Sequence, residues 1–205
     1  MLASLLLALC ACAGAQTYTL DPSTGALRAR LYRDGPLAAF GHDHVIAAPS
    51  FEGAVELSSA TATLRLSVDA RALKIDEDAV REALDLRTIS AADRVEIDKT
   101  MRGAKGLDVE SFPTMRLVSQ SIEPVPDEKD LWHVIGAFTL HGSTQTIEAP
   151  VAVRDGPGGG RWFSGYVRLR QTDFGIKPYS AFGGAVKVRD DFVVSFDLLG
   201  RPERR

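Results

Sequence analysis

Alternation of apolar and polar side chains with a period of two is the feature that most limits what this chain can fold into. In one stretch, Leu64, Leu66 and Val68 fall on one face, with charged or hydroxyl side chains on the other. Two later stretches repeat the pattern, through Trp132, Val134, Gly136, Phe138 and Leu140 and through Phe192, Val194, Phe196 and Leu198. A period of two is typical of β-strands with one buried face. The pattern therefore predicts a β-protein.

Further strands are expected where alternation recurs between turn signals, at 26–33, 38–47, 51–58, 114–122, 145–154 and 161–171. Two charge-rich patches, 76–86 and 90–102, have helical spacing, and Ser90 followed by Asp93 is an N-terminal capping signal. About nine strands and short helices, with no repeat or linker, indicate one all-β domain over residues 16–205, an antiparallel barrel or sandwich. A barrel of about eight strands either fills with side chains or holds one elongated ligand.

The charge balance excludes some classes of partner. With 24 Lys and Arg against 27 Asp and Glu among 205 residues, the formal net charge is −3. No long basic stretch exists to neutralise phosphates, so we expect no nucleic-acid partner. At 45%, the apolar content is too high for intrinsic disorder.

Residues 1–15 have the features of an export signal. The run 2–15 carries no charge, is shorter than the roughly 20 residues of a membrane-spanning helix, and ends in the small residues Ala13–Ala15, a cleavage pattern. No basic residue precedes this run. The alternative is a lipoprotein signal, in which Cys12 becomes acylated. Both alternatives predict a periplasmic or secreted protein that does not span a membrane.

The residues that nucleophilic catalysis requires are missing. Both cysteines, Cys10 and Cys12, lie inside the export signal, so cleavage leaves no thiol for a disulfide, a metal site or a nucleophile. There is no Gly-x-Ser-x-Gly elbow, and residues 173–175 repeat the letters Asp-Phe-Gly of a kinase motif without its companion elements. We therefore expect a protein that is not an enzyme and requires no cofactor.

His42 and His44 are the residues most open to a chemical role. Two apart on an expected strand, both side chains point to one face, together with Phe40 and Ile46. Three interpretations stay open: a hydrogen-bonded pair near a strand end, a polar contact to the head group of a ligand, or a metal site completed by a third ligand such as His141 or His133. The His-x-His spacing by itself is a weak metal signal.

Four segments in order resemble a known family: YTLD at 18–21, SFPTMRLVS at 111–119, GAFTLHGSTQ at 136–145 and RQTDFGIKP at 170–178. Together they are similar to the YceI-like family of exported bacterial proteins, over roughly residues 17–199. The resemblance implies a single extended, lipocalin-like antiparallel β-barrel in the periplasm that holds a polyisoprenoid in its lumen. The chain departs from the family pattern in segment 87–107 and in having two histidines, His42 and His44, where one is frequent.

The expected function is accordingly that of an exported binding protein that carries or stores a long isoprenoid lipid, such as a quinone or a polyprenyl chain. Burial would drive binding, since each buried CH2 contributes about 0.8 kcal/mol. The candidate contacts are Phe40, His42, His44, Phe138, Phe174 and Tyr179. Two alternatives stay open: a periplasmic metal- or redox-linked factor that uses His42 and His44, and a filled barrel that serves as an interaction module. Each of these functions is compatible with a homodimer of two copies of the chain.

Overall fold

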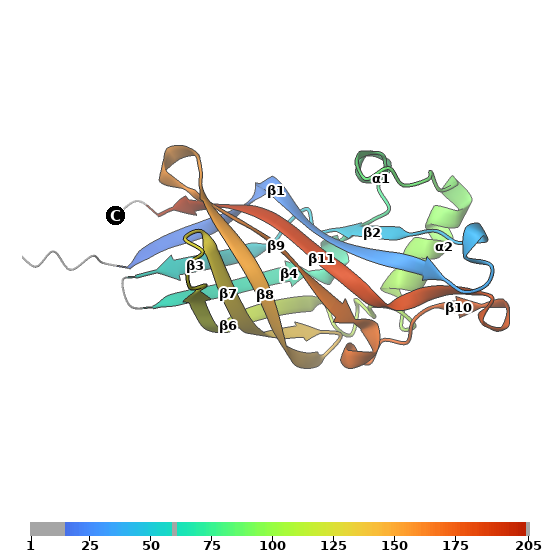
Figure 1. Cartoon of the computed structure of the whole chain (residues 1–205). Helices are drawn as coiled ribbons and strands as arrows, with labels where there is room; N and C mark the ends of the chain where they lie inside the picture. Colours follow the sequence, from blue (N-terminus) through green and yellow to red (C-terminus); the bar gives the residue numbers. More distant parts are fainter. Residues whose placement is uncertain (1–14, 59–60, 204–205) are drawn as a thin grey trace, which may run out of the picture.

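Eight strands close into an antiparallel barrel, which confirms the predicted fold class. The computed structural model describes residues 15–58 and 61–203 of the chain. The barrel strands are β1 (Gln16–Asp34), β3 (Glu52–Leu57), β4 (Ala62–Asp69), β6 (Thr114–Pro124), β7 (Leu131–Leu140), β8 (Ser143–Asp155), β9 (Arg161–Arg170) and β11 (Val186–Pro202). They pair in the order β11-β9-β8-β7-β6-β4-β3-β1, and β1 pairs with β11 to complete the ring (Figure 1).

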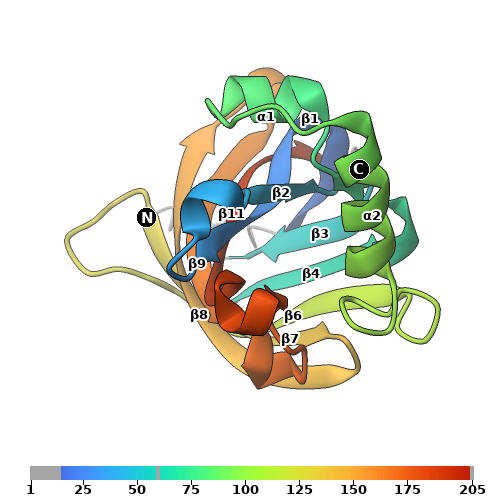
Figure 2. The same ribbon diagram turned by 90° about the vertical axis from the view of Figure 1, so that its right-hand side faces the viewer.

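Short elements extend and cover the barrel. Strand β2 (His44–Ala47) pairs with the second half of β1, β5 (Lys74–Ile75) pairs with β2, and β10 (Ser180–Ala181) pairs with β11. Helices α1 (Asp78–Ala83) and α2 (Ala91–Arg102) lie at one end of the barrel (Figure 2). One-turn 3-10 helices connect strands: η1 (Ala38–Phe40), η2 (Ala70–Ala72), η3 (Pro157–Gly159), η4 (Gln171–Phe174) and η5 (Phe182–Gly184).

Helix α2 begins where the sequence predicts. The Ser90 hydroxyl accepts a hydrogen bond of 3.1 Å from the backbone N–H of Asp93, as an N-cap does. Ile97 and Met101, one turn apart, pack against the main apolar core of the barrel. Within the described chain, no helix has the length and hydropathy that crossing a bilayer requires.

Strand β1 runs through residues 21–25, whose residue types are typical of turns. The Asp21 carboxylate accepts hydrogen bonds from the backbone N–H and hydroxyl of Ser23, at 2.9 and 2.6 Å. The pairing with β11 shifts register between Asp21 and Gly25, so these turn-forming residues make a β-bulge instead of ending the strand. Gly25 has φ +102°, and a Cβ there would lie 2.0 Å from the backbone oxygen of Asp197. Glycine is therefore required at this position.

The predicted strand over 38–47 is wrong in its first half. Residues Ala38–Phe40 form η1, and only His44–Ala47 pair as β2. A distant side chain holds the first half: the Arg87 guanidinium donates hydrogen bonds to the carbonyl oxygens of Ala39 and Gly41, at 3.1 and 2.7 Å. Because this donor lies more than 40 positions away, the local pattern could not reveal it.

Candidate functional site

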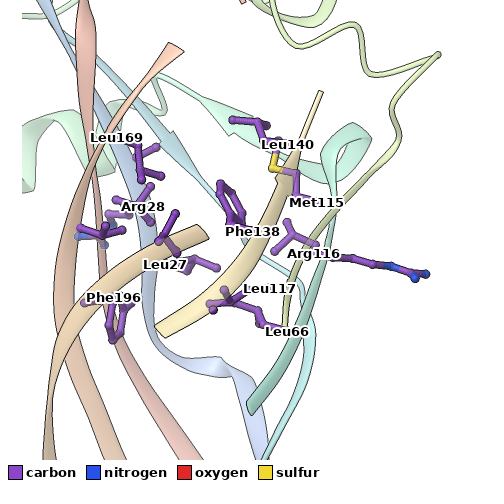
Figure 3. A pocket seen from close by; sticks show the side chains of 18 of the residues that line it. Leu27, Arg28, Leu66, Met115, Arg116, Leu117, Phe138, Leu140, Leu169 and Phe196 are labelled. Carbon is purple, nitrogen blue, oxygen red and sulfur yellow. The ribbon is translucent and has the colours of Figure 1, made fainter. Parts of the chain in front are cut away.

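The barrel encloses an apolar cavity of about 250 Å³. This volume exceeds the roughly 150 Å³ of an engineered apolar cavity that stays dry and accepts small apolar guests. Inward-facing positions of all eight barrel strands line it, and β2 and α2 contribute at one end. Figure 3 shows several lining residues, among them Leu27, Leu66, Leu117, Phe138, Leu169 and Phe196. The lumen is therefore hollow, which the filled-barrel alternative did not predict.

Polar groups are scarce in the cavity wall. Arg28, Arg116 and Gln171 are the lining residues with a charged or an amide side chain. Leu27 and Ala29 both pack against the apolar core, so strand alternation turns the intervening Arg28 outward. The Arg116 side chain extends away from the lumen (Figure 3). A ligand inside would therefore be held mainly by burial of apolar surface.

Two predicted contact residues, Phe138 and Phe174, come together. Phe138 on β7 lines the cavity. Phe174 in η4 is only 1% exposed, and its ring meets that of Phe138 edge to face, with centroids 5.5 Å apart and an interplanar angle of 76°. It belongs to a second apolar cluster that includes Leu140, Ile176 and Phe192. Phe174 thus supports the cavity wall from behind Phe138.

Two other predicted contacts, Phe40 and Tyr179, lie on the outer surface. Phe40 in η1 is 78% exposed, and Tyr179, just before β10, is 52% exposed. Neither side chain belongs to the cavity wall. Their contact with a ligand stays a prediction that the geometry of the lumen does not support.

His44 belongs to a buried ion-pair network beside α1. Its Nδ1 donates a hydrogen bond of 2.7 Å to the Asp76 carboxylate, which also accepts one of 3.0 Å from the backbone N–H of Val45. The Arg81 guanidinium, 2% exposed, donates to the same carboxylate. Burial raises the pKa of Asp76, but the bonds from His44 and Val45 and the charge of Arg81 outweigh it and hold the pKa below its usual value. His44 is therefore hydrogen-bonded, with Asp76 as its partner.

His42 lies beside this network without joining it. The His42 and His44 ring centroids are 6.4 Å apart. The buried Nδ1 of His42 has no hydrogen-bond partner among residues 15–58 and 61–203. Burial, followed by the neighbouring His44, Arg87 and Arg81, lowers the pKa of His42 below its ordinary value. Neither histidine lines the cavity, so their contact with a ligand head group stays a prediction.

The three histidines of the metal interpretation are not assembled. His141 lies with its ring centroid 4.5 Å from that of Phe112, and its Nδ1 is 3.2 Å from the carbonyl oxygen of Phe174. In the part of the chain that the structure describes, no group of three or more His, Cys, Asp or Glu side chains could hold a metal ion. The described residues thus give the metal interpretation no geometric support.

Sequence reasoning missed Asp76, Arg81 and Gln171. Asp76 has an unusual positive φ of 54°, and its partner His44 lies 32 positions earlier, so no local pattern marks the pair. Gln171 did have a signal, because it extends the row of alternate residues that ends in Leu169 on β9. A polar residue that continues an apolar inward row is therefore the signal that could have identified Gln171.

Comparisons with known proteins agree with this architecture. A family model described as a YceI-like domain matches residues 18–199. Burkholderia cenocepacia BcnA has a similar structure, with a TM-score of 0.66 over 89% of this chain and 99% of that chain, at 17% identity. A polyisoprenoid binding domain from Saccharophagus degradans has a TM-score of 0.60 over 91% and 98%, at 12% identity. At these identities the likeness shows the fold alone.

Curated relatives match a shorter stretch. A UPF0312 protein of Pseudomonas putida is 32% identical over 107 residues, which are 49% of this chain and 54% of the relative. The chain therefore spans about half the length of the curated relatives it matches.

Proposed function

The chain belongs to the YceI-like domain family, and on that premise we propose that it carries or stores a long apolar isoprenoid lipid, without catalysis. The hollow, apolar lumen of about 250 Å³ is the observation that carries the proposal. Burial of an apolar chain at about 0.8 kcal/mol per CH2 would give affinity with few polar contacts. The polyisoprenoid binding domain of Saccharophagus degradans, which shares the fold, supports this ligand class.

Export is part of the same proposal. The signal at 1–15, with its alternative acylation site Cys12, lies outside the described residues except for Ala15. A periplasmic or secreted location would place the carrier where lipids must cross an aqueous space. A homodimer stays a prediction.

Lipid extraction from the purified protein tests the proposal. Ala149 on β8 lines the cavity and is 7% exposed, so Ala149→Phe places a ring inside the lumen. Ala152, three positions later on the same strand, is not part of the cavity wall, and Ala152→Phe is the matched control. We expect native mass spectrometry to find a prenyl lipid on the wild type and the control but not on Ala149→Phe. Recovery of no lipid from the wild type, or equal recovery from Ala149→Phe, would contradict the proposal.

A further inference from the structure

One polar side chain in the apolar lumen, that of Gln171, bears on the chemistry of the ligand. We propose that Gln171 binds the head group of the lumen ligand, and that this group is neutral, an alcohol or a quinone, and not a phosphate. The inference rests on the proposed carrier function, since it specifies the ligand of the same cavity.

Strand geometry directs Gln171 inward. On β9, Phe163, Val167 and Leu169 line the cavity, while Tyr166 between them is 63% exposed. Gln171 continues the inward row at the first position of η4, where it is 8% exposed and lines the same cavity. The side chain of Gln171 therefore contributes to the lumen wall.

One hydrogen bond fixes the orientation of this carboxamide. The Nε2 of Gln171 donates 2.7 Å to the carbonyl oxygen of Arg189 on β11. None of the residues in 15–58 and 61–203 donates a hydrogen bond to the Oε1. The Oε1 is not among the fully enclosed polar atoms that lack a partner, so it is free to accept a hydrogen bond from a ligand, and one N–H remains for an acceptor. A hydroxyl group supplies the donor, and a quinone carbonyl accepts the remaining N–H.

Among the described residues, the cavity wall presents no cationic side chain that could bind a phosphate. Proteins bind phosphates with Arg or Lys side chains, but Arg28 and Arg116, the two cationic residues of the wall, point away from the lumen as described above. A charged phosphate at Gln171 would be buried without a counter-charge, which is strongly unfavourable. A neutral head group avoids this penalty.

The position of Gln171 also gives the ligand a direction. Phe174 and Ile176, shortly after Gln171 in the chain, pack with Leu140 at the last position of β7. Trp132, which also lines the cavity, lies eight positions earlier on that strand, about 27 Å away along an extended strand. A prenyl tail would therefore run from the Gln171 end of the lumen toward Trp132.

The proposal is tested by ranking head groups on one chain length. Displacement of N-phenyl-1-naphthylamine from the full protein is measured with geranylgeraniol, geranylgeranyl diphosphate, a menaquinone with four isoprene units, and the C20 hydrocarbon without a head group. We expect the wild type to bind the alcohol and the quinone at least tenfold more tightly than the diphosphate. This ranking needs no variant.

Two variants then assign the effect to one side chain. Gln171→Leu should lose about tenfold in affinity for the alcohol and for the quinone and keep its affinity for the hydrocarbon. Gln145→Leu is the matched control, because Gln145 also donates through Nε2 to a backbone oxygen, that of Asp173 at 2.7 Å, but is exposed and outside the lumen. The control should bind every ligand as the wild type does.

The possible failures are distinguishable. Equal affinity for alcohol and diphosphate would overturn the head-group inference and leave the carrier proposal standing. An equal loss for alcohol and hydrocarbon in Gln171→Leu would show that the amide only supports the wall, and would also overturn it. If no prenyl chain displaces the dye, the carrier proposal fails, and the inference fails with it.

Discussion

Replacing Asp76 by asparagine should strongly destabilise the fold. The Asp76 carboxylate is fully buried and balances the charge of Arg81, which is 2% exposed. Asparagine keeps the shape but removes the charge, and its amide cannot accept from both His44 and Val45 as the carboxylate does. Removing one partner of a buried pair costs about 3–5 kcal/mol. For a domain of this size, at about 2–4 °C per kcal/mol, the melting temperature should fall by roughly 6–20 °C.

Urea unfolding followed by circular dichroism measures this loss. The control is Glu56→Gln, which breaks the exposed pair between Glu56 and Arg65, whose side chains are 42% and 69% exposed. Exposed pairs contribute about 0–1 kcal/mol, so the control should stay close to the wild type. A loss below about 1 kcal/mol for Asp76→Asn would refute the argument that this network holds the α1 end of the barrel together.

The Asp76 carboxylate also predicts how the free energy of unfolding changes at acid pH. Its folded-state pKa lies below the unfolded value near 3.9, so the contribution of Asp76 is complete above about pH 4 and is lost as the pH falls toward the folded-state value. Asp76→Asn should therefore lose less stability than the wild type between pH 4 and pH 2. An equal loss of stability in the wild type and in Asp76→Asn between pH 4 and pH 2 would contradict this prediction.

Two further predictions concern His42 and the glycine of the β-bulge. The lowered pKa of His42 means that the fold favours its neutral ring, so wild-type stability should fall as the pH drops below about 6.5. Urea titrations at pH 7.5 and 5.5 should show a smaller fall in stability for His42→Gln than for the wild type. Equal falls would contradict the prediction for His42. Gly25→Ala should destabilise the fold by about 1–3 kcal/mol or more, because it combines a left-handed φ with a clash against Asp197. The control is Gly158→Ala, at φ +63° with no atom within 4 Å of the added Cβ, which should lose clearly less stability in the same urea assay. Equal losses of stability would show that the clash is absent.

The barrel could be predicted from the sequence because its signals are local. Alternation along β4, β7 and β11 identifies the inward rows, and Ser90 marks the start of α2. The 26–33 and 38–47 predictions failed at their boundaries because the deciding contacts are distant: the Asp197 backbone opposite Gly25 and the Arg87 guanidinium at η1.

The site was predictable only in part for the same reason. Phe138 falls on an inward row, so its place in the cavity wall follows from strand periodicity. The two-residue spacing of His42 and His44 suggested a shared role, but the partner of His44 is Asp76, from another part of the chain. Tertiary pairing of this kind leaves no periodic trace in the sequence.

Closure of the barrel also affects how fast a guest can be exchanged. Since β1 and β11 join the two ends of the sheet, sideways passage of a lipid would require neighbouring strands to separate along many backbone hydrogen bonds. A lipid held as proposed would then enter and leave through the ends of the barrel, one of which is bordered by Met101 of α2 and by Leu107 just after it. For the proposed lipid, we expect substitutions of Met101 or Leu107 to change the exchange rate more than the equilibrium affinity.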